Sequence, residues 1–283
     1  AAEGFVPSVY DFSGSGNNAL SVILNFGQDS SFAGTKTSQG NQDSNDIGDF
    51  YYTPPTNFLA LCTENMAEPG VTPGEHFNTV LYTGDGNSTH AITGVGFQPD
   101  FVWIKNRDTT NWYTLQDVIR TPDATIYCNT NEGQNATRAY VNSFDSDGFT
   151  TGNAAGASKG PSNNSGDAYV SWNWKAGGSG SANTSGTINS TVSANTDAGF
   201  SVVSFTGTGS AGTVGHGLST TPRLIMFKNL ATSDDWMVFT YRLTSLNEMN
   251  LNENHASTVT NVFNDTNPTS TVFSVGAENA TKF

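Results

Sequence analysis

Two runs of apolar residues have the pattern of strands that are buried on both faces. They are FVWIK at residues 101–105 and LIMFK at residues 224–228. Each has four consecutive apolar residues, with a proline shortly before the run and an asparagine directly after it. A strand of this kind offers neither face to water, so we predict interior strands at both places.

The run AYVSWNW at residues 168–174 has a different pattern. It alternates, so that Tyr169, Ser171 and Asn173 share one face of a strand. Val170 and the two tryptophans of the run share the other face. The sequence therefore predicts a third strand whose two faces meet different surroundings.

Turn signals separate these runs, and no sustained helical period interrupts them. FNTVLYTG at residues 77–84 ends in Thr-Gly and is followed by Asp-Gly, which predicts a tight hairpin turn. One short helical turn is expected near Leu115–Arg120. Many short strands with turns between them predict an all-β fold of tandem antiparallel β-sandwich or jelly-roll-like domains.

The chain also resembles itself, with an offset of 123 residues between Phe77 and Phe200. FNTVLYTG (77–84) matches FSVVSFTG (200–207), NWYTLQDVIR (111–120) parallels DWMVFTYRLT (235–244), and SDGFTTG (146–152) parallels STVFSVG (270–276). Pro99, Lys105 and Asn106 correspond to Pro222, Lys228 and Asn229. Matches that keep their order over most of a unit predict an internal duplication.

This repeat sets the expected domain boundaries. They are an N-terminal β segment at 1–66, a Pro/Gly-rich linker at 67–76, a first sandwich repeat at 77–178, a Gly/Ser/Thr/Asn-rich linker at 179–198 and a second repeat at 199–283. Within the N-terminal segment, LSVILNFGQ (20–28) alternates as a strand does, and DFYYTPP (49–55) is a second strand candidate. The segment is short for an independent sandwich, so we expect it to be the end of a larger domain.

The second repeat has no counterpart of AYVSWNW. The offset of 124 between Phe149 and Phe273 would place that strand near residue 292, beyond Phe283. A sandwich that lacks one strand has an open edge, which is a site of unwanted pairing. We therefore expect another segment, another subunit or a continuation of the chain to close the second repeat.

Composition and charge exclude several classes of partner. Charged residues make up 13% of the chain, and 25 acids against 11 bases give a net charge of −14. Such a surface repels nucleic-acid phosphates and anionic lipid headgroups, so we expect neither partner. No apolar run approaches the roughly 20 residues of a membrane span. Cys62 and Cys128 are isolated and are interpreted as ordinary, partly buried thiols.

Two glycine motifs match catalytic patterns but lack their structural context. Gly156-Ala-Ser158-Lys-Gly160 has the spacing of a nucleophile elbow, yet its flanks predict a loop instead of a strand and a helix. Gly207-Thr-Gly209-Ser-Ala-Gly212 follows a strand but precedes no helix that could hold a pyrophosphate. We interpret the second motif as hairpin chemistry and assign no cofactor and no catalytic residue.

Oxygen-rich turns supply the candidates for calcium binding. Hard cations prefer carboxylate and carbonyl oxygens. The candidates are Asp43, Asn45, Asp46 and Asp49 in one loop, and Asp145 and Asp147 in another. The first loop departs from the EF-hand pattern, because Ile47 and Pro54 stand at ligand positions. An Asx-stabilised turn is the alternative interpretation for both loops.

Other candidate chemistry has little specificity. His76, His90, His216 and His255 do not fall at metal-binding spacing. Acidic residues are so numerous that a pair suited to glycoside hydrolysis carries no information. Trp112, Trp172, Trp174 and Trp236 could stack on sugars if exposed. The alternative is that they belong to the core, which the position of two of them beside Val170 on one strand face favours.

The chain resembles a repeat family of uncharacterised function in marine tailed bacteriophages. The matching stretches are VLYTGDGNSTHAITGVGFQPDFVWIKNR, NSFDSDGFTTG, YVSWNWKAG and TINSTVSANTDAGFSVVSFTGTGSAGTVGHGL. The segments NFGQDSSFAG, QGNQDSNDIGDFYYTPP and NFLALCTENM are similar to the end of a lectin-like or SPRY-like sandwich in such proteins. The chain starts without Met and ends inside the second repeat, so we expect it to be part of a longer protein.

The resemblance implies a non-enzymatic protein of the virion surface, of the fibre or appendage type, with host attachment as its task. It implies other virion proteins as partners, a homo-oligomer, and a host-surface glycan or receptor as ligand. Two alternatives stay open. One is a capsid decoration or head-fibre protein, and the other is a soluble carbohydrate-binding module.

Overall fold

The computed structural model describes residues 23–66, 70–120, 124–135, 140–152, 161–243, 247–254 and 256–277. The chain divides into two compact units, Ala1–Gly70 and Val71–Phe283. The boundary falls inside the Pro/Gly-rich linker that the sequence predicts at 67–76.

The first unit is built from turns, and its described residues form no strand longer than an isolated bridge. That bridge joins Asn41 to Phe50, and a 3-10 turn, η1, spans Thr63–Asn65. The strand expected at 20–28 is therefore wrong for residues 23–28, and residues 20–22 lie outside the described part. The reason is local, because the side-chain oxygens of Asn25 and Gln28 accept backbone N–H groups of residues 27 and 26 and so favour a turn.

The second unit is antiparallel β structure, as the sequence predicts. Its first half contains η2 (Pro73–Glu75), β1 (Phe77–Thr83), β2 (His90–Thr93), β3 (Phe101–Asn106), β4 (Thr114–Asp117), β5 (Ile126–Tyr127), β6 (Val141–Asp145), β7 (Gly148–Thr151) and β8 (Ala168–Trp174). Its second half contains β9 (Ser181–Asn183), β10 (Ser190–Asn195), β11 (Phe200–Phe205), β12 (Gly212–Gly215), β13 (Leu224–Phe227), β14 (Met237–Thr240), β15 (Asn247–Asn250), β16 (Thr258–Val259) and β17 (Val272–Val275).

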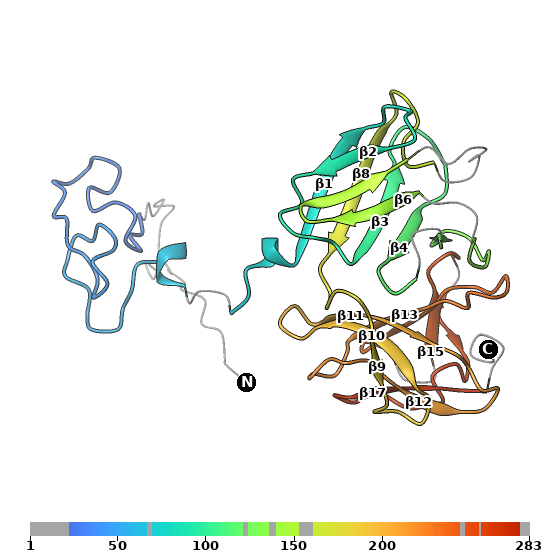
Figure 1. Ribbon diagram of the computed structural model, residues 1–283. Coiled ribbons are helices and arrows are strands. Elements are labelled where there is room, and N and C mark those ends of the chain that lie inside the picture. The colour runs from blue at the N-terminus through green and yellow to red at the C-terminus, as the bar shows by residue number, and fades with distance from the viewer. Residues whose placement is uncertain are drawn as a thin grey trace, which may run out of the picture. The chain divides into compact units, whose positions relative to one another are not determined.

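The first half is a sandwich of two sheets (Figure 1). One sheet has the order β1-β8-β3-β4-β5, and the other has the order β2-β7-β6. The core between them contains Val102 and Ile104 of β3, Ile92 of β2, Phe149 of β7 and Tyr169 of β8. Val102 and Phe149 have no exposed surface, so the two sheets are in close contact.

Strand β8 lies between β1 and β3 in the five-stranded sheet and confirms the predicted alternation. It pairs with β1 from Phe77↔Trp174 to Thr83↔Ala168, and with β3 from Phe101↔Trp174 to Asn106↔Tyr169. Tyr169, Ser171 and Asn173 are fully buried on the face that meets the second sheet. The opposite face carries the tryptophans of the strand.

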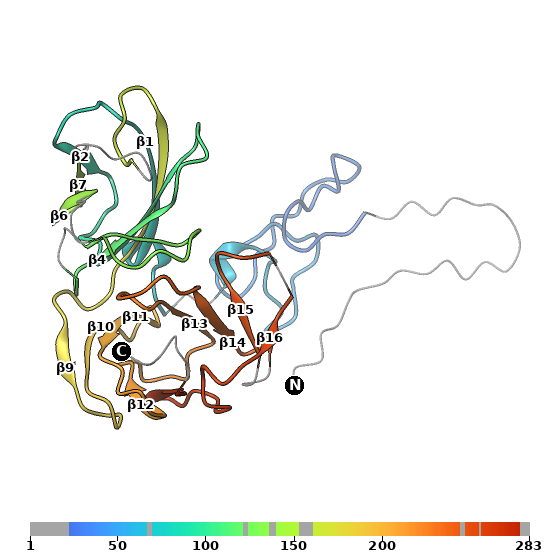
Figure 2. The same cartoon turned by 90° about the vertical axis from the view of Figure 1, so that its right-hand side faces the viewer.

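The second half uses matching strands in the same pairs. As β2 pairs with β7 through Ile92↔Phe149, so β12 pairs with β17 through Val214↔Phe273. As β3 pairs with β4 and β4 with β5, so β13 pairs with β14 and β14 with β15. Figure 2 shows the strands of the second half at the base of the unit. Strands β11 and β13 lie side by side there but belong to separate sheets.

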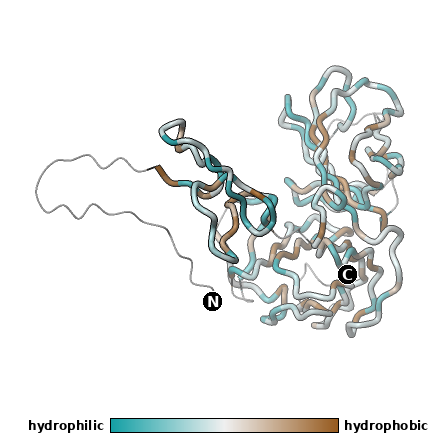
Figure 3. The backbone as a smooth tube through the Cα atoms, turned by 90° about the vertical axis from the view of Figure 1, so that its left-hand side faces the viewer, coloured by the Kyte–Doolittle hydropathy of each residue, from teal (hydrophilic) through white to brown (hydrophobic). Residues whose placement is uncertain are grey.

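The two halves of this unit share a hydrophobic cluster. Leu115, Ile126 and Cys128 of the first half pack with Trp236 of the second half. The indole Nε1 of Trp236 donates a hydrogen bond of 2.7 Å to the carbonyl oxygen of Tyr127. Figure 3 shows short hydrophobic and hydrophilic stretches alternating along the chain. The halves are therefore one structural unit.

Several local predictions are wrong. The linker expected at 179–198 contains β9 and β10, because β10 pairs with β11 and β9 pairs with β10. The turn after β1 is not a hairpin, because β1 pairs with β8 and β2 pairs with β7 in the other sheet. Residues 114–117 form β4 instead of a helical turn, and Asp117 Oδ1 accepts the N–H groups of Ile119 and Arg120 in the bend that follows.

Candidate functional site

The first calcium candidates serve as hydrogen-bond acceptors inside the turns of the first unit. The Asp43 carboxylate accepts N–H groups from Ala60 (2.7 Å), Asn45 (2.8 Å) and the Asn65 amide (2.7 Å). These bonds lower the pKa of Asp43 although burial opposes them as the largest single influence. N–H groups that point at a carboxylate compete with a cation for its oxygens, so this geometry fits a turn better than a metal ligand.

The other calcium candidates do not gather around one point. Asp49 accepts the N–H groups of Ser30 (3.0 Å) and Gly40 (3.1 Å), a different set from that of Asp43. The side-chain amide of Asn45 bonds to Asn65, and the backbone carbonyl of Asp46 accepts the side-chain amide of Gln42. Across the described residues, no three His, Cys, Asp or Glu side chains are placed to share a metal ion.

Asp145 and Asp147 stabilise the β6–β7 turn of the second unit. Asp145 accepts the hydroxyls of Ser143 (2.8 Å) and Thr150 (2.7 Å). Asp147 accepts the N–H groups of Gly94 (3.1 Å) and Gly96 (2.7 Å), and these two bonds lower its pKa. Asp145 therefore stabilises the strand pair from within, and Asp147 fastens the turn to the segment after β2.

None of the four tryptophans proposed as sugar platforms is an exposed residue. Trp236 is 4% exposed, and Trp112, Trp172 and Trp174 are half-buried. Trp172 lies edge-on to Trp103, with ring centroids 5.9 Å apart. Trp174 stacks on Phe200 of the second half at the same distance. These contacts favour packing over stacking on a ligand.

The described residues show no arrangement typical of a catalytic site among the glycine motifs, the histidines and Cys128. The glycine motif at 207–212 links β11 to β12, so no helix follows it. Its interpretation as a hairpin turn is wrong, because β11 pairs with β10 and β12 pairs with β17. The motif at 156–160 lies outside the described residues, as does His255. His216 is buried, accepts the N–H of Leu218 at Nδ1 and contacts the Thr269 carbonyl at Nε2, and burial lowers its pKa. Burial also raises the pKa of the Cys128 thiol to about 12, so it stays protonated.

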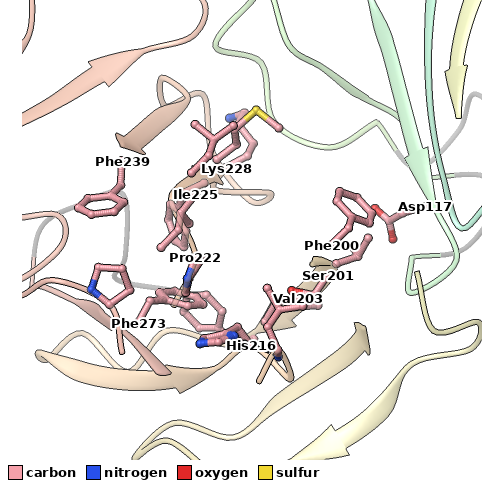
Figure 4. A pocket seen from close by; sticks show the side chains of 18 of the residues that line it. Asp117, Phe200, Ser201, Val203, His216, Pro222, Ile225, Lys228, Phe239 and Phe273 are labelled. Carbon is pink, nitrogen blue, oxygen red and sulfur yellow. Dashed lines mark hydrogen bonds between the residues drawn. The ribbon is translucent and has the colours of Figure 1, made fainter. Parts of the chain in front are cut away.

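The second unit has a groove between β11 and β13, with a volume of about 1670 Å³. Phe200, Ser201 and Val203 line one side, and Pro222 and Ile225 line the other (Figure 4). Sequence reasoning expected an open edge in the second repeat. It did not identify the two strands that border the gap, because which strands flank β8 is decided by pairing between distant segments.

The charged groups around this groove already have partners. Arg120 Nε and Asp117 Oδ2 form an ion pair of 2.6 Å that is almost completely buried. The Lys228 ammonium donates to the carbonyl oxygens of Asn229 (2.9 Å) and Asp234 (2.7 Å). Burial lowers the pKa of Lys228, and the nearby carboxylates of Asp234 and Asp235 oppose this effect. The groove thus offers apolar surface and strand edges more than titratable groups.

Fold and groove together define an antiparallel β protein with an unfilled gap between two sheet edges. Residues 72–282 match a family described as a domain of unknown function (DUF7483), and the chain belongs to that family. No curated protein matches the chain, and no solved structure matches it. In the described residues, no helix is long and apolar enough to span a membrane.

Proposed function

We propose that this chain is a structural protein of a virion surface, of the fibre or appendage type, that contributes to host attachment and catalyses no reaction. The observation that carries the proposal is how its polar groups are used. The carboxylates of Asp43, Asp49 and Asp147 accept backbone N–H groups that fix turns. Groups committed in this way hold a scaffold together and are not placed for proton transfer to a substrate.

The composition supports the same proposal. A net charge of −14 limits non-specific aggregation of the scaffold, and salt screens its exposed charges over about 8 Å at physiological ionic strength. The sequence resemblance to repeat proteins of marine tailed phages supplies the virion setting. Other virion proteins, further copies of this chain and a host-surface glycan or receptor are the proposed partners.

Counting the copies of this chain in purified particles tests the proposal. A fibre or tail appendage is expected to contain a small multiple of three or six copies per particle, measured by quantitative mass spectrometry. Hundreds of copies would instead identify a capsid decoration protein. A monomer attached to no particle would contradict the virion proposal, and glycan-array binding would then test the carbohydrate-binding alternative.

A further inference from the structure

In the first half of the second unit, β8 fills the space between β1 and β3 and bonds to both. The N–H of Arg107 donates to the Ala168 carbonyl (2.7 Å), one step beyond the paired residues Asn106↔Tyr169. Antiparallel pairs alternate between bonded and non-bonded. The backbone groups of Phe101 and Trp103 therefore point towards β8, since they lie an even number of residues from Arg107.

The corresponding positions of β13 point into the groove. Tyr241 N–H donates to the Arg223 carbonyl (3.0 Å), so Arg223 and then Ile225 bond towards β14. Leu224 and Met226, which match Phe101 and Trp103, direct their backbone groups to the opposite edge. Among the described residues, β13 pairs with β14 alone and β11 pairs with β10 alone, so both edges that face the groove are unpaired.

Side-chain burial shows what this gap leaves exposed. Ile104 and Val102 of β3 are at most 2% exposed, whereas their counterparts Phe227 and Ile225 are only half-buried. Leu224 is 57% exposed and Met226 is 37% exposed. A strand between β11 and β13 would cover this apolar surface, as β8 does in the first half.

The groove also has the size and side chains for such a strand. Its volume of about 1670 Å³ exceeds the roughly 300–1,000 Å³ of small-molecule pockets. In the first half, the ring of Tyr169 stacks on Tyr82 of β1 at 5.1 Å. Phe205 of β11 stands at the matching position and contacts Phe227 and Phe273, so an aromatic residue of the incoming strand has a surface to pack on.

We infer that the groove between β11 and β13 receives an extended strand with the side-chain pattern of β8, supplied by a partner polypeptide. The strand pairs antiparallel with both edges. Its last aromatic residue lies beside Phe200 and Leu224, as Trp174 lies between Phe77 and Phe101. This pairing does not depend on the proposed virion role.

A peptide with the sequence of residues 166–177 is the probe, and hydrogen exchange of the whole chain is the measurement. Without peptide, the groove-facing amides of 200–205 and 224–227 exchange rapidly. With peptide at 100 times its Kd, their exchange slows about 100-fold. The amides of β12 and β17, away from the groove, keep their rates and report that the fold is intact.

Two controls distinguish strand pairing from non-specific binding of the peptide. A peptide carrying Ser171→Pro cannot complete the ladder and is expected to give no protection. In the protein, Met226→Pro removes a groove-facing N–H and weakens the effect at least tenfold, while Met226→Val preserves it. The control with the Ser171→Pro peptide remains valid even if the Met226→Pro protein fails to fold.

Three outcomes would overturn the inference. The first is no slowing at 1 mM peptide, on the order of the weakest specific affinities. The second is slow exchange of both strands in the monomer without peptide, which would mean that the chain closes its own groove. The third is protection that appears only with dimers seen by light scattering, which would identify a second copy as the occupant.

Discussion

At the scale of single residues, a Lys-Asn pair stabilises the turn at the end of each of two distant strands, β3 and β13. The ammonium of Lys105 donates to the carbonyls of Asn106 and Thr109, and that of Lys228 donates to Asn229 and Asp234. Burial lowers the pKa of both lysines. Each lysine therefore closes the turn after its strand.

The buried ion pair of Asp117 and Arg120 gives a first prediction. Arg120→Met leaves the Asp117 carboxylate buried with backbone N–H donors alone, so we expect the free energy of unfolding to fall by about 3 kcal/mol. Urea unfolding measures the change. Arg223→Met is the matched control, because Arg223 is exposed and its guanidinium lies over the face of Tyr241, so the substitution should cost at most about 1 kcal/mol. Equal losses would contradict the prediction.

His216 gives a prediction for pH. Burial lowers its pKa in the folded chain, so the unfolded chain binds a proton at higher pH than the folded chain does. The contribution of neutral His216 to the free energy of unfolding is complete above the pKa of about 6.5 in the unfolded chain. This contribution is lost as the pH falls below that value. We expect His216→Val, which copies the matching Val95, to flatten the stability profile between pH 7 and 5. An unchanged slope in chemical denaturation would refute this.

At the scale of elements, the same strand has different surroundings in the two halves. β3 lies between β8 and β4, whereas β13 lies between the groove and β14. An interior strand loses water from both edges and both faces, and an edge strand does not. The position of a strand in its sheet therefore decides how much each of its side chains contributes.

Matched truncations test that statement. Ile104→Ala removes a side chain that is 2% exposed, and we expect a loss of about 2–5 kcal/mol in unfolding free energy. Ile225→Ala removes the same side chain beside the groove, and we expect less than about 1.5 kcal/mol, since that site is already in contact with water. Guanidinium unfolding measures the free energy of both variants. A larger loss of unfolding free energy for Ile225→Ala than for Ile104→Ala would contradict the open groove.

At the scale of the whole molecule, the second unit depends on contacts between its halves. Trp236 completes a cluster formed mainly by the first half, and Phe200 stacks on Trp174. Besides its own core, each half contributes side chains to this shared cluster. Residues 71–283 should therefore unfold together.

Calorimetry of Trp236→Phe tests this coupling. The substitution keeps most of the ring but removes the hydrogen bond to Tyr127, which we expect to cost about 1–3 kcal/mol. The midpoint of a single shared transition should fall by about 2–4 °C per kcal/mol. Trp172→Phe, within one sheet of the first half, serves as the comparison. Two separate transitions for the halves would show that they are independent.

The sequence by itself determined the all-β class and the places of several strands of the second unit. The continuous runs became the strands β3 and β13, and the alternation of Tyr169, Ser171 and Asn173 is confirmed as the buried face of β8. These strands were recognisable because burial imposes its own period on the chain. The predicted interior position is wrong for residues 224–228, because β13 is an edge strand and Leu224 is 57% exposed.

Only the tertiary structure decided which strands pair and what the polar residues do. The Ser/Thr-rich stretch 179–198 has a linker's composition, yet β10 in it is a strand because β11 provides its partner. The roles of Asp43 and Asp147 depend on N–H groups from distant residues. The groove exists because β11 and β13 meet across a gap, and hydrogen bonds between remote segments leave no local period in a sequence.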